Sequence, residues 1–160
     1  MIVYFIYVKS ALSYRMPLNI NKIMVCLFCS DDEGVVLDQA VFFAEKFDAS
    51  LVAIHVNRPH AGEMSMMMDN SGSKITKDMI KNMFVKHGYE QWLKKLEIRT
   101  PEDDIVSKTI AKHAQDVDML ILGHRKMNTF KASFSDSVDE GIANLVSCPV
   151  VTISLPKRVH

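Results

Sequence analysis

Short apolar runs alternate with amphipathic segments along this chain. The runs at residues 20–28, 50–56, 118–122 and 150–155 are rich in valine, isoleucine and leucine, which predicts strands buried on both faces. A shorter run at 96–99 predicts one more strand. Between the strands, apolar residues recur every three or four positions, which predicts amphipathic helices. Strict alternation of strands and helices favours an α/β domain in which helices cover both faces of a parallel sheet.

Capping patterns predict where several helices begin. Residues 30–33 and 137–140 both have the form of a capping box, a serine with an acid three positions later. Residues 100–103 combine threonine, proline and two acids, which predicts a helix that starts there. Residues 74–95 predict a helix interrupted near Gly88. The inner face of the helix after residue 100 would consist of Ile105, Thr109, Ile110 and Ala114.

Length and charge exclude several classes of protein. The 160 residues suit a single domain. Lysine plus arginine and aspartate plus glutamate number 19 each, so no net basic field favours nucleic acid. Three cysteines are too few for a secreted disulfide scaffold. We therefore expect a cytoplasmic protein with no nucleic-acid partner.

The N-terminal segment is apolar but short. Residues 1–8 fall well below the ~20 apolar residues that span a bilayer, and they lack the positive region of a signal peptide, so no membrane partner is expected. Two interpretations stay open. Either Met16 is the natural first residue, or the segment forms an extra strand or an arm that packs on a partner. We divide the chain into an extension at 1–18, a domain at 19–156 and a tail at 157–160.

The stretch from residue 117 to 140 carries the main candidate for function. The predicted strand at 118–122 is followed by Gly123, and a basic segment begins with His124, Arg125 and Lys126. A predicted helix start follows. Strand, glycine, loop and helix N-terminus are the parts of a phosphate-binding turn in an α/β protein.

This stretch resembles the nucleotide loop of the universal stress protein family. ATP-binding members of that family carry Gly-x2-Gly-x9-Gly-Ser/Thr after their fourth strand. Gly123 and Ser137 match the first glycine and the final serine at that spacing, whereas Lys126 and Asp136 replace the second and third glycines.

The resemblance extends along most of the chain. Residues 22–25 followed by Ser30 resemble the first strand and turn of the family, and residues 147–153 resemble its last strand. The resemblance implies a Rossmann-like, doubly wound, open sheet of five parallel strands in the order 3-2-1-4-5. That order places the loop at the switch point between strands 1 and 4, where open α/β sheets bind ligands.

The family site implies an adenine nucleotide as ligand. ATP or AMP would bind at this edge of the sheet, with Mg²⁺ only if ATP binds. The candidate contact residues are Ser30, Asp31, Val56, Gly123, His124, Arg125, Lys126, Ser137 and Val138.

Three departures from the family pattern argue against tight binding. A left-handed conformation, easy for glycine, costs Lys126 roughly 1 kcal/mol. The carboxylate of Asp136 would repel phosphate and could itself satisfy the free amides of the helix start. Phe28 stands where ATP-binding members usually carry an acid that holds the ribose. The loop therefore favours weak nucleotide binding or none.

The last strand predicts a self-association surface. Residues 149–155 are apolar at both alternating sets of positions, and an apolar strand at a sheet edge normally acquires a partner. The resemblance implies antiparallel pairing of these strands across a two-fold axis. We expect a homodimer, and an unidentified protein partner besides. The residues expected near the seam are Val150, Val151, Ile153 and Leu155.

Other chemistry has less support. Cys26 and Cys29 form a C-x-x-C, but a strand holds them about 10 Å apart, beyond the roughly 7 Å limit for a disulfide. Methionines at 64–68 with His60 could bind Cu(I), yet they lie on an irregular segment, and we expect no metal. We therefore favour a stress-response dimer that binds nucleotide weakly or not at all. An ATP or AMP sensor using residues 123–137 is the alternative. An enzyme ranks last, since no base or nucleophile is placed.

Overall fold

The computed structural model describes residues 5–7, 19–59, 61, 73–125 and 138–155 of the chain. Lys126 and Ser137, two of the candidate contacts, lie outside these ranges, as do Asp136 and the methionines of 64–68. Of Arg125 and Val138 the structure describes only the backbone.

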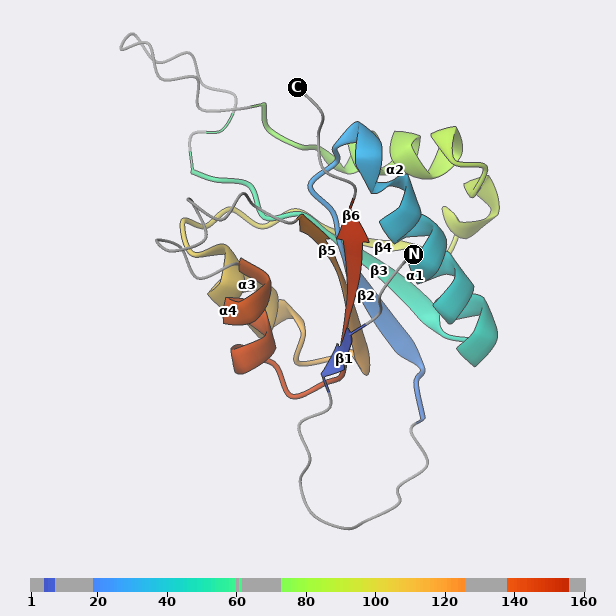
Figure 1. Ribbon diagram of the computed structural model, residues 1–160. Coiled ribbons are helices and arrows are strands. Elements are labelled where there is room, and N and C mark those ends of the chain that lie inside the picture. The colour runs from blue at the N-terminus through green and yellow to red at the C-terminus, as the bar shows by residue number, and fades with distance from the viewer. Residues whose placement is uncertain (1–4, 8–18, 60, 62–72, 126–137, 156–160) are drawn as a thin grey trace, which may run out of the picture.

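One mixed sheet forms the centre of the molecule (Figure 1). Its order is β1-β6-β5-β2-β3-β4, and the last five are mutually parallel. The predicted five-stranded parallel sheet with order 3-2-1-4-5 is therefore confirmed. The strands are β1 (Phe5–Tyr7), β2 (Lys22–Cys26), β3 (Ser50–Ile54), β4 (Glu97–Arg99), β5 (Met119–Arg125) and β6 (Val150–Leu155).

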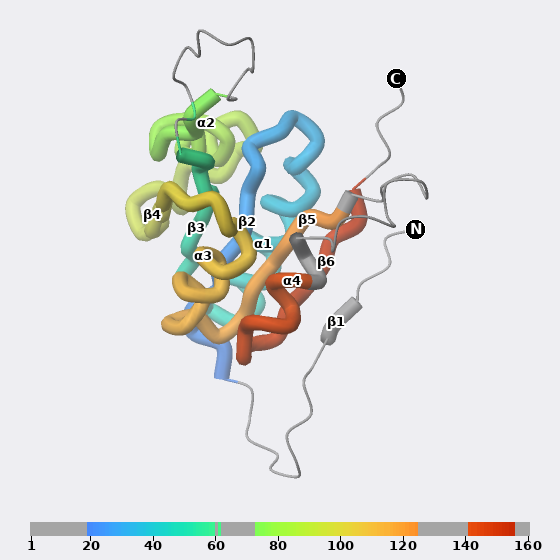
Figure 2. The backbone as a smooth tube through the Cα atoms, turned by 90° about the vertical axis from the view of Figure 1, so that its left-hand side faces the viewer, coloured from blue at the N-terminus to red at the C-terminus, as the bar shows by residue number. Residues whose placement is uncertain are grey.

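Helices cover both faces of the sheet, as predicted. The helical segments are η1 (Asp31–Glu33), α1 (Gly34–Phe47), α2 (Lys77–Lys86), η2 (Glu90–Trp92), α3 (Val106–His113) and α4 (Val138–Leu145). Residues of β2, β3, β5 and β6 face two separate apolar clusters, one with α1 and α2, the other with α3 and α4. Figure 2 shows α3 and α4 in front of the strands and α1 behind them. Among the described residues, no helix is long and apolar enough to cross a membrane.

The outer edge of β6 is covered in part by β1. The two strands pair antiparallel, with Phe5 opposite Thr152 and Tyr7 opposite Val150 (Figure 1). Residues 5–7 of the N-terminal segment thus form an extra strand on this sheet. The residues expected at a dimer seam are buried inside this chain, and they are Val150, Val151, Ile153 and Leu155. A partner on β6 would consequently meet backbone groups rather than these side chains.

The predicted helix start at residues 100–103 is wrong. Instead, the chain continues alongside β3, where the Asn57 amide donates to the Pro101 carbonyl and the Asp103 amide donates back to Asn57, at 2.8 and 3.0 Å. The Asp103 carboxylate accepts from the Ile105 amide at 3.0 Å and the Thr109 hydroxyl at 2.7 Å. Strand pairing thus outcompetes the local capping signal, and α3 begins only at Val106. Ile105, predicted on the inner face, is exposed.

Candidate functional site

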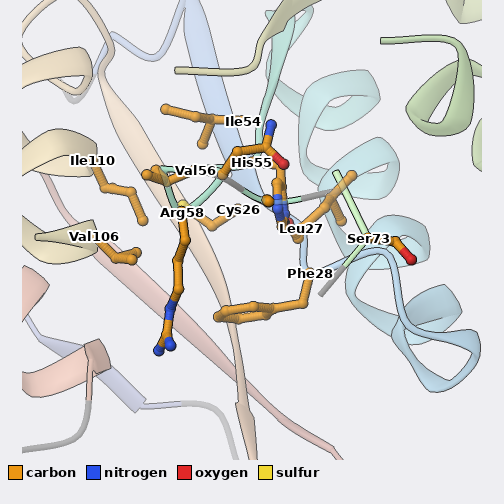
Figure 3. A pocket seen from close by; sticks show the side chains of 12 residues that line it. Cys26, Leu27, Phe28, Ile54, His55, Val56, Arg58, Ser73, Val106 and Ile110 are labelled. Atoms are coloured by element: carbon orange, nitrogen blue, oxygen red, sulfur yellow. The ribbon is translucent and has the colours of Figure 1, made fainter. Parts of the chain in front are cut away.

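A pocket lies where β2 and β3 end, at the carboxyl edge of the parallel strands. Its volume is about 310 Å³. Its lining consists of the end of β2 through Phe28, the end of β3 through Arg58, two residues of α3, and the single residues Ala61 and Ser73 (Figure 3). Among the described residues, Val56 is the one member of the predicted contact set that lines it. Open α/β sheets bind ligands at this edge, so the pocket is the candidate site.

Phe28 stands at the mouth of the pocket. It follows β2 directly, and its side chain is 51% exposed. Figure 3 shows the Phe28 ring and the Arg58 side chain at the end of the pocket away from Ile54. The structure thus places a phenyl ring at the end of the first parallel strand, where the resemblance would place a ribose-binding acid. A ring there offers stacking but accepts no hydrogen bond from a hydroxyl.

The turn after β2 is filled by the carboxylate of Glu33. Its two oxygens accept from the Phe28 amide at 3.0 and 2.9 Å, and one of them accepts from the Ser30 amide at 3.1 Å. Glu33 has no exposed surface. Burial raises its pKa, while the amide hydrogen bonds act in the opposite direction. Cys29, between the two donors, has φ of 58° and lets both amides face the same carboxylate.

The Glu33 carboxylate limits which backbone amides of this turn a ligand can bind. Backbone amides that converge after a strand can hold an anion. Here those of Phe28 and Ser30 already hold the anion that Glu33 supplies. The capping box predicted at residues 30–33 therefore forms, and it makes the first turn self-sufficient. A phosphate would have to displace a buried carboxylate to bind these amides.

Ser30 and Asp31, two candidate contacts, point their polar groups at protein partners. The Ser30 hydroxyl donates to the Asp32 carboxylate at 2.8 Å. Asp31 forms an exposed ion pair with Lys86 of α2 at 3.1 Å. Neither residue lines the pocket.

His55 is a pocket residue that the sequence interpretation missed. Its Nδ1 lies 2.7 Å from the Leu27 carbonyl oxygen, and because a carbonyl only accepts, Nδ1 carries the proton. Burial lowers the pKa of His55, with a smaller opposing effect of that hydrogen bond. The neutral ring then keeps a lone pair on Nε2. The position of His55 directly after a predicted buried strand is the feature of the sequence that could have identified this residue.

Asn57 fixes the floor of the pocket. It is 2% exposed, and its side-chain amide both donates to and accepts from the backbone of Ile75, at 3.0 and 2.8 Å. Its backbone pairs with the segment before α3, as described above. One buried amide thus joins the end of β3 to two other segments, which holds the pocket walls in register.

On the other side of the switch point, Gly123 lies inside β5 and does not end it. The strand continues through His124, half-buried, to Arg125. A Cβ atom at Gly123 would lie 3.0 Å from Cγ2 of Val36 and 3.2 Å from Cδ1 of Leu155. Close packing of α1 and β6 therefore explains the glycine without any ligand.

Within the described ranges, no group of three or more histidine, cysteine or acidic side chains could hold a metal ion. None of the three cysteines forms a disulfide. Burial raises the pKa of Cys29 to about 11, with a further contribution from the charge of Glu33. Such a thiol is protonated and unreactive at neutral pH.

The comparison with protein families decides the assignment. The family described as Universal stress protein family matches residues 19–154. The chain belongs to this family. A search of curated proteins finds no match.

Solved universal stress proteins share the fold at low sequence identity. One from Archaeoglobus fulgidus DSM 4304 is 16% identical with a TM-score of 0.66, and the match covers 96% of this chain and 50% of that one. The chain thus spans about half the length of that relative. A universal stress protein in complex with cAMP is 15% identical, with a TM-score of 0.62 and coverage of 86% and 99%. One from Archaeoglobus fulgidus in complex with dAMP is 19% identical, with a TM-score of 0.54 and coverage of 84% and 98%.

Proposed function

We propose that this universal stress protein is a homodimeric stress-response protein that acts through protein contacts and binds adenine nucleotides weakly or not at all. The observation that carries the proposal is the turn after β2. Its amides are taken by the buried Glu33 carboxylate, and Phe28 stands where a ribose-binding acid is expected. One side of the nucleotide site is thereby lost. The replacements at Lys126 and Asp136 weaken the other side.

A calorimetric titration of the purified chain tests this proposal. The ligands are ATP with Mg²⁺, AMP, cAMP and dAMP. We expect no saturable heat up to millimolar concentrations of any of them. A dissociation constant below about 10 μM, near −7 kcal/mol, would refute the proposal and establish a nucleotide sensor.

A nucleotide sensor is the second candidate, and the pocket favours it. Its volume of about 310 Å³ lies at the low end of ligand pockets. Arg58 at its mouth carries the positive charge that a phosphate would need, and two relatives were crystallised with cAMP and dAMP. AMP would then stack on Phe28, with Mg²⁺ needed only for ATP.

Two variants distinguish a stress-response protein that binds no nucleotide from a nucleotide sensor. Phe28→Asp supplies the missing acid, and an increase in AMP affinity of tenfold or more would show that Phe28 limits binding. Arg58→Ala is the matched change on the opposite wall. If the chain is a sensor, this variant loses at least tenfold in AMP affinity. If the chain binds no nucleotide, the variant leaves the titration flat.

A further inference from the structure

The N-terminal strand occupies the surface that the proposed homodimer needs. β1 pairs antiparallel with residues 150–152 of β6, whereas β6 itself continues to Leu155. A strand of only three residues is a short cover for an edge that is twice as long. Pairing through only three residues forms few ladder hydrogen bonds, so β1 is a cover that a longer strand can displace.

The direction of the backbone groups follows from the register. The Pro149 carbonyl accepts from the Leu120 amide of β5 at 2.9 Å, so it points towards β5. Alternate residues of a strand present their amides and carbonyls to the same side. Val150, Thr152 and Ser154 consequently direct theirs to the outer edge of β6.

The same register fixes which residues of β1 bind that edge. Tyr7 lies opposite Val150 and Phe5 opposite Thr152, so their backbone groups face β6. Ile6 lies opposite Val151, which bonds to β5, so the Ile6 amide faces away from β6. Two of the three outward positions of β6 are thus paired with β1.

A second copy of the chain could pair with all three outward positions. Antiparallel pairing of two β6 strands about a two-fold axis can use the full length of Val150–Leu155, and the contacts run through the backbone because the side chains are buried or half-buried. β1 has the advantage of being tethered, with an effective concentration on the order of millimolar. The balance between the two pairings therefore depends on the concentration of the chain.

We propose that β1 is an intramolecular competitor for the β6 edge, which keeps the chain monomeric until a second copy displaces it. The inference rests on the homodimer proposed above and adds its regulation. Conditions that release β1 promote the dimer, and conditions that hold β1 oppose it.

Proline substitutions in the full chain test this competition. Tyr7→Pro removes an amide that faces β6, and Ile6→Pro places the same ring one residue away, where the amide faces outward. Sedimentation velocity over about 1–200 μM would give the dimer dissociation constant of each. We expect Tyr7→Pro to lower it at least tenfold relative to the original chain and Ile6→Pro to leave it within about threefold. Phe5→Pro, whose amide also faces β6, should repeat the effect of Tyr7→Pro.

Three other results would contradict this inference or both proposals. If the original chain and all variants dimerise with the same constant, β1 is no competitor, while the homodimer proposal stands. If Ile6→Pro weakens the dimer, the second copy docks on the outer edge of β1 and the inference is overturned. If every variant stays monomeric at 200 μM although circular dichroism shows it folded, both proposals fail.

Discussion

Replacing Glu33 tests whether the turn after β2 depends on an internal anion. In Glu33→Ala, the amides of Phe28 and Ser30 lose the acceptor that now lies 2.9–3.1 Å away. The left-handed backbone at Cys29 also loses the contacts that hold it in place.

The magnitude follows from the number of amides left without a partner. A buried donor without an acceptor costs about 1–3 kcal/mol, and two are affected. Because Phe28 is half exposed, water reaches part of this turn and moves the total towards the lower half. We expect Glu33→Ala to reduce the free energy of unfolding by about 2–4 kcal/mol. Glu33→Gln keeps one acceptor oxygen but turns an NH₂ group towards an amide, and we expect about half that loss.

Urea unfolding followed by circular dichroism at pH 7 measures these changes. Asp31→Ala is the control, since it removes a neighbouring acid that is exposed and pairs only with Lys86. Its midpoint should stay within error of the original chain. If Glu33→Ala lowers the free energy of unfolding by less than 1 kcal/mol, or by no more than the control does, the Glu33 carboxylate does not stabilise this turn. Either result would also remove the main support for weak nucleotide binding.

Three other predictions concern the same end of the sheet. Gly123→Ala brings a methyl group against Val36 and Leu155, so we expect a loss of about 1–3 kcal/mol in urea unfolding, partly restored by Val36→Ala. Burial lowers the pKa of His55, so the unfolded chain binds its proton first, and stability should fall as pH drops below about 6.5. In His55→Gln, urea midpoints between pH 7.5 and 5.5 should change less. Because burial raises the pKa of Cys29 to about 11, its alkylation by iodoacetamide should be slow at pH 8 and half-maximal near pH 11, and a midpoint near 8.5 would contradict its burial.

The central strands β2, β3 and β5 could be predicted because they are buried on both faces and therefore carry continuous apolar runs. Residues 20–28 and 118–122 gave β2 and β5 in this way, although β5 runs on to Arg125. The start of α3 could not be predicted from caps alone. Residues 100–103 satisfy every local rule for a helix start, yet a strand partner in Asn57, remote in sequence, offers their backbone better hydrogen bonds.

The sequence pointed to the carboxyl edge of the sheet, but among the described residues only Val56 of the predicted contacts lines the pocket found there. The capping box at residues 30–33 was visible, since it is a local pattern. The hydrogen bond from the Phe28 amide to Glu33 was not visible, because it depends on the path of the chain after β2. His55 and Arg58 were missed because a single polar residue after a strand is common, and only the fold brings both to one pocket.

The two proposals converge on β6. Its outer edge is shared between β1 and the proposed second copy, while its inner edge pairs with β5 through Gly123 and Arg125. Leu155, the last residue of β6, also lies against Gly123. A second copy that takes the place of β1 would therefore pair with one edge of β6 while the pairing of the other edge with β5 stays in place.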